Sequence, residues 1–160
     1  MRSLHINISE QTLSLLDDGQ VFKHFSISSA LNGIGQSEGS GQTPIGPHYI
    51  RAKIGEGMKL NTVFVGRRNT GEIYDASLAA QYPSRDWILT RILWLCGQEV
   101  GFNRLGKVDS MARYIYIHGT PDTEPMGEAK SHGCIRMRNE DVLELYNWVP
   151  AGCPVMIVQS

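Results

Sequence analysis

The sequence has almost no excess of charge of either sign, because 15 lysines and arginines stand against 16 aspartates and glutamates in 160 residues. A formal net charge of -1 gives no reason to expect a polyanion as partner, so nucleic acid is excluded. Long apolar runs are also missing. Runs such as Trp87–Leu89 and Ile92–Cys96 are far shorter than the ~20 residues of a membrane span, so we expect no membrane partner.

Cysteine is scarce as well, with only Cys96, Cys134 and Cys153 in the chain. An odd count without a C-x-x-C pair argues against a disulfide framework and agrees with a reducing compartment. Cys96 follows an apolar run and Cys153 precedes another, so both are expected to be packed, unreactive thiols. Cys134 is left as the thiol with a chemical role.

The first residues lack the pattern of an export signal. They alternate apolar and polar side chains from Arg2 to Ile8, whereas a signal peptide needs a longer unbroken apolar stretch after its basic start. If Met1 is the natural start, the expected location is the cytoplasm. The length suits a single domain over residues 1–160, which is large enough to bury its own core.

Alternating apolar residues predict an antiparallel meander near the start of the chain, with a turn at residues 17–20. Residues 32–47, rich in glycine, are expected to form a surface loop, and residues 67–72 a polar turn. We expect a short helix at residues 75–82, and a buried strand or short helix at residues 86–95. Strands are predicted at residues 4–8, 12–16, 21–27, 48–54, 61–65, 113–118 and 154–158.

One clear helix is predicted near the end of the chain. Asn139 has the residue type of an N-cap, and acidic residues follow it in the first turn. Val142, Leu145, Tyr146 and Val149 fall on one helical face, which indicates packing against a core. The predicted fold class is therefore mainly β with one clear helix, in a single domain.

The candidate chemistry centres on Cys134, which has His132 two residues before it and His118 at the end of a predicted strand. A cysteine nucleophile reacts as the thiolate and needs a base or a cationic neighbour. Gly133 permits close approach of a substrate, and the N–H groups of Gly133 and Cys134 are candidates to hold an oxyanion. In an extended segment Arg136 projects on the same side as Cys134, where a guanidinium suits a substrate carboxylate.

Two other interpretations of these residues stay open at this point. His118, His132 and Cys134 are three ligands of the kind that zinc selects, although a fourth is not evident in the sequence. A purely structural loop is the second alternative. Nucleophilic catalysis is favoured over both, with no metal and no other cofactor expected.

The stretch Ser131-His132-Gly133-Cys134-Ile135-Arg136-Met137, together with His118-Gly119-Thr120, resembles the catalytic signature of the YkuD-type L,D-transpeptidase domain. The Thr43-Pro44-Ile45-Gly46 segment is similar to another motif of that family. The resemblance implies a β-sandwich in which Cys134 is the nucleophile and His118 the general base. It further implies that the carbonyl of Gly119 orients His118, that His132 and Gly133 shape the oxyanion site, and that Ser131 and Arg136 support the loop.

The resemblance also implies a substrate, the peptidoglycan stem tetrapeptide or a sugar-linked muropeptide. Cys134 would attack the carbonyl of meso-diaminopimelate and expel the terminal D-alanine. Water as the acceptor makes the protein an L,D-carboxypeptidase of cell-wall recycling, whereas an amine makes it a cross-linking or exchanging L,D-transpeptidase. The first is preferred because no export signal is visible. A non-enzymatic scaffold or sensor is disfavoured because the cysteine and histidine are intact.

Overall fold

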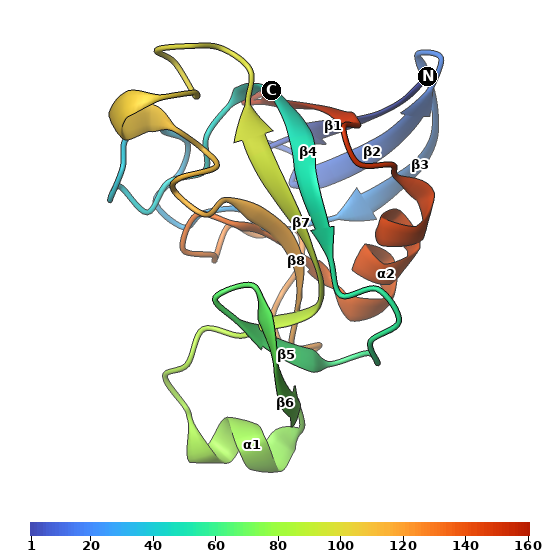
Figure 1. Ribbon diagram of the computed structural model, residues 1–160, viewed down its shortest axis with the longest axis vertical. Coiled ribbons are helices and arrows are strands. Elements are labelled where there is room, and N and C mark those ends of the chain that lie inside the picture. The colour runs from blue at the N-terminus through green and yellow to red at the C-terminus, as the bar shows by residue number, and fades with distance from the viewer.

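The computed structural model describes residues 1–160 and is dominated by one curled sheet of ten strands (Figure 1). The main path of the sheet runs β3-β2-β1-β10-β4-β7-β5-β6, while β8 pairs with β7 and β9 pairs with β8. The strands are β1 (Arg2–Asn7), β2 (Thr12–Asp17), β3 (Gln20–Ser26), β4 (Gly46–Ile54), β5 (Thr62–Val65), β6 (Arg68–Ile73), β7 (Ile88–Gly97), β8 (Tyr116–Thr120), β9 (Ile135–Arg138) and β10 (Pro154–Val158). The helices are α1 (Ala76–Gln81), α2 (Asn139–Trp148) and the 3₁₀ turn η1 (Gly106–Val108).

The first three strands form the antiparallel meander that their alternation predicts. Asp18 and Gly19, both with positive φ, make the two-residue turn between β2 and β3. Such a turn matches the twist of a hairpin and favours a glycine at its second position. The last strand, β10, lies parallel to β1, so the two ends of the chain are joined in the middle of the sheet. No helix of the structure is long and apolar enough to cross a membrane.

Strand β7 connects the two halves of the molecule, because it pairs with β4, β5 and β8. Its pairing with β8 is interrupted between Leu89 and Ile92, where Thr90 has φ +73°. A positive φ is unusual for a β-branched residue and marks a bulge that bends the strand. The bulge lies where β7 passes from its pairing with β4, through Ile92–Gly97, to its pairing with β5, through Ile88 and Leu89.

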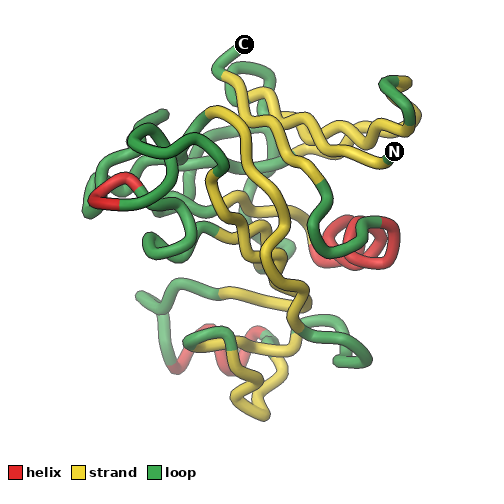
Figure 2. Tube along the Cα trace, turned by 45° about the horizontal axis from the view of Figure 1, so that its top comes forward, coloured by secondary structure: helices red, strands yellow, loops and turns green.

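The core lies between the curled sheet and α2. Twenty buried residues form one apolar cluster, to which α2 contributes Val142, Leu145 and Tyr146 and its C-cap position Val149, the face that the spacing predicts. Residues 55–87, which hold β5, β6 and α1, project away from this core (Figures 1 and 2). Val63, Trp87 and Leu89 form a small second core there. We call residues 55–87 the arm.

Three local predictions are wrong. Residues 67–72 are not a polar turn, because the turn is only Gly66 and Arg67 and the strand β6 follows it. His118 lies in the middle of β8 rather than at the end of a strand. Asn139 is the first residue of α2, and the N-cap position belongs to Arg138. The amide of Asn139 is buried and bonds to groups outside the helix, so it does not cap its own helix.

A buried histidine holds the start of β4 against the loop that precedes β8. His48 is 1% exposed, with Nδ1 3.0 Å from the carbonyl of Gly46 and Nε2 2.8 Å from Oγ of Ser110. Nδ1 must carry a proton to donate to the carbonyl, so Nε2 accepts from the serine hydroxyl. Burial lowers the pKa of His48 to about 4 and keeps the ring neutral.

This histidine predicts a loss of stability in acid. The unfolded chain protonates His48 near pH 6.5, whereas the folded chain resists until about pH 4, so stability falls as the pH drops through this window. The expected loss from His48 alone is about 3 kcal/mol. Urea unfolding at pH 7 and pH 4 should show a smaller pH dependence in His48→Gln than in the wild type. Equal dependence in the two proteins would contradict the buried neutral ring.

Candidate active site

The parallel pairing of β8 with β9 brings the two predicted catalytic residues together. In this register His118 is the partner of Arg136, and Ile117 is the partner of Ile135. Side chains alternate along a strand, so Tyr116 and His118 on β8 share a face with Cys134 and Arg136 on the neighbouring segment. Residues that are 16 apart in sequence thereby line one cavity.

Cys134 lies immediately before β9, half-buried, with its sulfur bonded to the main chain of the strand opposite. Sγ accepts from the N–H of Tyr116 at 3.4 Å and donates to the carbonyl of Tyr114 at 3.3 Å. Burial raises the pKa of the thiol to about 12, against smaller lowering effects of the Tyr116 N–H, Arg136 and Arg113. The resting group is therefore a thiol and not a thiolate.

His118 is buried, and Gly119 orients it. Nδ1 is 2.7 Å from the carbonyl oxygen of Gly119, so Nδ1 carries the proton and Nε2 is left as a base. Burial lowers the pKa of His118, which keeps the imidazole neutral at neutral pH. The carbonyl of Gly119 thus has the position that the resemblance implied for it.

Gly119 also has to be a glycine. A Cβ at this position would lie 2.4 Å from Oδ1 of Asn139 and 2.6 Å from the carbonyl oxygen of Leu89. Both distances are below any real Cβ contact. The small residue lets β8 pass close to the bulge of β7 and the start of α2, and so sets the position of the carbonyl that His118 uses.

The loop before Cys134 is braced by two hydroxyl groups. Oγ of Ser131 donates to the carbonyl of Cys134 at 2.5 Å and accepts from the N–H of Gly133 at 3.2 Å. Oγ1 of Thr43, fully buried, donates to the carbonyl of Gly133 at 2.9 Å and accepts from the N–H of Ala30. The Thr43 segment is therefore part of the site and not a plain surface loop.

The oxyanion site differs from the sequence prediction in one respect. The N–H of Gly133 already donates to Ser131, whereas the N–H of Cys134 has no acceptor within the chain. Gly133 has φ +133°, a conformation that favours glycine, so its role is to shape the turn. Of the two predicted donors, only the N–H of Cys134 is free to hold a developing oxyanion.

Arg136 and His132 meet a carboxylate that the sequence did not single out. Nη2 of Arg136 is 3.2 Å from Asp86, Nη1 is 3.8 Å from Glu124, and the arginine side chain is only 9% exposed. Nδ1 of His132 is 3.3 Å from the same Asp86, although this ring is 74% exposed. The guanidinium predicted to bind substrate is thus already paired with two carboxylates.

A cavity of about 530 Å³ opens over Cys134 and contains the predicted residues His118, Ser131, His132 and Arg136. It also contains residues that the sequence analysis missed. The additional lining residues are Gly66, Arg67, Asp86, Ile88, Arg113, Tyr114 and Tyr116. Tyr114 and Tyr116 had a signal in the sequence, because their even spacing from His118 on the predicted strand gives them the same face.

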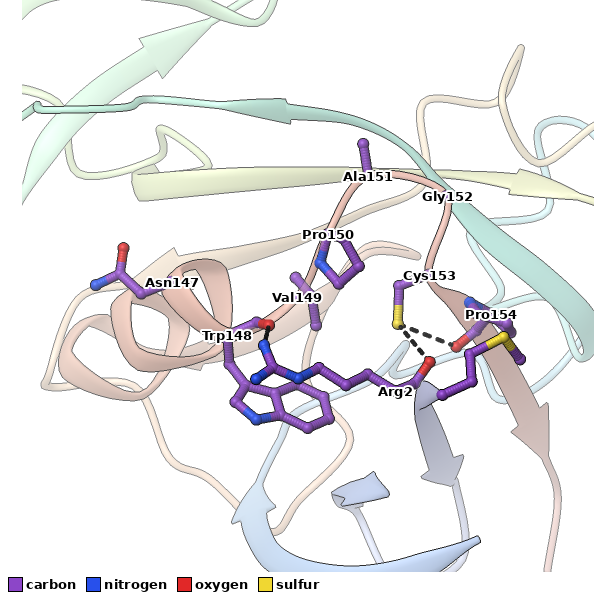
Figure 3. A pocket seen from close by; sticks show the side chains of 10 residues that line it. Arg2, Asn147, Trp148, Val149, Pro150, Ala151, Gly152, Cys153 and Pro154 are labelled. Carbon is purple, nitrogen blue, oxygen red and sulfur yellow. Dashed lines mark hydrogen bonds between the residues drawn. The ribbon is translucent and has the colours of Figure 1, made fainter. Parts of the chain in front are cut away.

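A second cavity of about 590 Å³ lies between the first residues of the chain and the end of α2 (Figure 3). It contains Cys153, whose sulfur points to the carbonyls of Arg2 and Pro154 at 3.5 and 3.6 Å. Burial raises the pKa of Cys153 to about 11, and no histidine lines this cavity. Cys153 and the buried Cys96 therefore have the packed environments that were expected.

The structure contains no set of ligands for the zinc ion that the sequence left open as an alternative. No group of three or more histidine, cysteine, aspartate or glutamate side chains is placed to hold a metal ion. His118 bonds through Nδ1 to Gly119, and His132 faces Asp86, so the two rings are engaged in different contacts.

A thiol and a buried imidazole that line one cavity are the groups that a cysteine acyl-transfer site requires. Comparison with protein families gives the same class, since the model of the YkuD family, the L,D-transpeptidase catalytic domain, matches residues 1–157. The chain belongs to this family of cysteine acyl-transfer enzymes. The predicted β fold with one clear helix is confirmed by solved structures of the family.

Individual relatives match over shorter stretches. The protein named as the L,D-transpeptidase YkuD of Bacillus licheniformis is 56% identical over 49 residues, or 30% of each chain, and YqjB of Bacillus subtilis is 40% identical over 61 residues, or 38% of this chain and 33% of its own. The matched stretch thus spans about a third of each relative.

Solved structures match over nearly the whole chain. L,D-transpeptidase 3 of Mycobacterium tuberculosis superimposes with a TM-score of 0.59 at 18% identity, covering 98% of this chain and 60% of that one. The Enterococcus faecium L,D-transpeptidase gives 0.58 at 17%, covering 98% and 49%. At this identity the likeness shows the fold.

The raised pKa of Cys134 predicts slow alkylation at neutral pH. With a pKa of about 12, reaction of Cys134 with iodoacetamide should accelerate about tenfold per pH unit from pH 7 to 10, without a plateau. The measurement is mass spectrometry of the peptide that contains Cys134, with a free thiol as reference. A plateau near pH 6 to 7 would show a preformed thiolate and imidazolium pair, and the description above would be wrong.

The tight contacts of Gly119 predict a large cost for one added methyl group. Gly119→Ala should lower the free energy of unfolding by about 1–3 kcal/mol, because the Cβ overlaps Asn139 and Leu89. Gly57→Ala is the control, since nothing lies within 4 Å of its added Cβ and only the positive φ is strained. Urea unfolding of both variants tests this, and a Gly119→Ala protein as stable as the wild type would contradict the close packing at Gly119.

Proposed function

We propose that the chain is an L,D-carboxypeptidase that removes the terminal D-alanine from peptidoglycan tetrapeptides. The observation that carries the proposal is the neutral pair of Cys134 thiol and His118 imidazole in one cavity, with Nδ1 of the imidazole fixed by Gly119. This pair is equipped to form a thioester with the diaminopimelate residue of the stem peptide.

In the first step His118 removes the proton of Cys134 through Nε2, and Sγ attacks the carbonyl carbon of diaminopimelate. The thiol donates to Tyr114 at rest, so the S–H has to turn toward the imidazole as the substrate binds. The carbonyl oxygen becomes an oxyanion that the N–H of Cys134 stabilises. His118 then donates the proton to the amine of D-alanine, the C–N bond breaks, and the thioester remains.

In the second step water replaces the amine. His118, neutral again, takes a proton from water, and the resulting hydroxide attacks the thioester carbonyl. The C–S bond breaks, the sulfur recovers its proton from His118, and the tripeptide leaves with a new carboxylate. The enzyme returns to its resting thiol and imidazole.

The charge of the cavity supports water over an amine as the acceptor. Three guanidinium groups, Arg67, Arg113 and Arg136, line the cavity, whereas two carboxylates oppose them, Asp86 in its lining and Glu124 beside Arg136, so positive charge is in excess. An amine of a second stem peptide approaches as an ammonium ion and is repelled by the excess positive charge, whereas water is neutral. The transpeptidase reaction, cross-linking or exchange of the terminal residue, is the second candidate, since it shares the thioester.

The location is part of the same proposal. Cross-linking acceptors lie outside the membrane, whereas tetrapeptides returned by recycling are in the cytoplasm. Hydrolysis to a tripeptide that re-enters precursor synthesis therefore fits a cytoplasmic enzyme. The substrate is a free tetrapeptide or its sugar-linked muropeptide.

The direct test uses the purified protein and Cys134→Ala with a stem tetrapeptide that ends in diaminopimelate and D-alanine, alone or with an excess of another D-amino acid. Mass spectrometry should show tripeptide and free D-alanine with the wild type, and a decrease in rate of at least about 10³-fold with Cys134→Ala. Because hydrolysis is the proposed outcome, the added amino acid should enter little product.

Other products would change the assignment. A new tetrapeptide that carries the added D-amino acid, formed in excess over tripeptide, would make the protein an exchanging transpeptidase. No turnover of any stem peptide by the wild type would overturn both functions.

A further inference from the structure

The positive charges of the catalytic cavity differ in what they contact. Arg136 is paired with Asp86 and Glu124 and is nearly buried, so its charge is already compensated. A residue that binds a substrate carboxylate in this cavity has to be a cation that no carboxylate of the protein already pairs with, and it needs free N–H donors. Arg67 and Arg113 are the two remaining guanidinium groups.

The guanidinium of Arg113 already donates hydrogen bonds to residues of the glycine-rich loop. Its Nη2 donates to the carbonyl of Gln42 at 2.7 Å and to Oγ of Ser40 at 3.4 Å, and Nη1 donates to the carbonyl of Gly35 at 3.3 Å. These contacts hold the glycine-rich loop against the site. Arg113 is therefore a brace for the loop that carries Thr43.

The guanidinium of Arg67 has N–H donors that are not used in hydrogen bonds within the chain. Its guanidinium lies over the rings of Trp94 and Tyr114, 4.6 and 4.9 Å from their centroids, and Nη1 donates to the hydroxyl of Tyr116 at 2.9 Å. Arg67 takes part in no ion pair, and the bond to Tyr116 raises its pKa, so it stays charged. A planar guanidinium laid on aromatic rings is held in place while its remaining N–H groups stay open to a ligand.

The backbone at Arg67 indicates that the side chain is needed there. Gly66 and Arg67 are the two central residues of the turn between β5 and β6, with φ of +57° and +65°. Glycine, asparagine or aspartate is the residue expected in such a turn, and arginine pays a conformational cost. The turn delivers the guanidinium from the arm to the cavity above Cys134.

We propose that Arg67 is the receptor for the terminal carboxylate of the substrate, at the leaving-group side of Cys134. This inference rests on the proposed function. The carboxylate of the departing residue lies one residue beyond the attacked carbonyl, at most about 3.6 Å of chain. Its receptor must therefore line the same cavity as the nucleophile, and Arg67 does. Tyr116 connects the two residues, since its hydroxyl contacts Arg67 and its N–H contacts Sγ.

The test compares two substrates that differ only at the end of the chain, the tetrapeptide with a free carboxylate and the same peptide with a terminal amide. The wild type should cleave the free acid with a kcat/KM about 10- to 100-fold above that of the amide, the range expected for a charge-assisted contact. Arg67→Gln should lose most of this preference by slowing the acid while leaving the amide almost unchanged. Arg67→Lys keeps the charge without the fork and should recover part of the preference.

Arg68→Gln is the matched control. It removes the same charge from the next residue, which is exposed on β6 and does not line the cavity. Its preference for the acid over the amide should equal that of the wild type. A general effect of net charge on a carboxylate substrate would appear equally in both variants.

Three results would overturn the inference, each in a distinct way. If Arg67→Gln lowers kcat/KM for the free acid and for the amide by the same factor, the role of Arg67 is only to hold the β5–β6 hairpin against Tyr116. If the wild type cleaves both substrates equally well, the carboxylate has no receptor, although the proposed hydrolysis stands. If the wild type cleaves neither peptide, the proposed function itself fails and the subsite with it.

Discussion

The parallel pairing of β8 with β9 is the constraint on which the catalytic geometry depends. It places Cys134 and Arg136 beside Tyr116 and His118, and both hydrogen bonds of the sulfur are to the main chain, at Tyr116 in β8 and at Tyr114 just before it. Parallel strands cannot be joined by a tight turn, so the chain between Thr120 and Ser131 crosses over as a loop. That loop also supplies Glu124, which meets Arg136.

A buried amide fixes this strand pair to the rest of the molecule. Nδ2 of Asn139 donates to the carbonyl of Thr120 and to Oδ1 of Asn61, both at 3.0 Å, while its Oδ1 accepts from the hydroxyl of Thr90 at 2.6 Å. The bulge of β7, the end of β8, the start of α2 and the base of the arm therefore meet at one side chain. The same amide closes the space over Gly119, so the orientation of His118 depends on it indirectly.

The sequence could predict what local patterns encode. The short stretch around Cys134 predicts it as the nucleophile because thiol, glycine and histidine stand close together, and the apolar spacing of α2 gives its buried face. The strand β6 could not be predicted, because Arg68–Ile73 is polar. It is an edge strand that pairs only with β5, to which the turn at Gly66 and Arg67 connects it. The sequence did not indicate Asp86 and Arg67 as site residues, for a different reason. Each enters the site through tertiary folding of the arm, and nothing in its neighbours along the chain marks it.

The protonation of the resting site restricts how the reaction can begin. A proton that moves from a thiol whose pKa is raised by burial to an imidazole whose pKa is lowered by burial goes uphill. A free thiolate and imidazolium pair would therefore add to the barrier of the reaction. Formation of the C–S bond together with proton transfer avoids this intermediate, because negative charge then passes to the carbonyl oxygen at the N–H of Cys134. Burial thus keeps the thiol inert until a carbonyl is present to receive the charge.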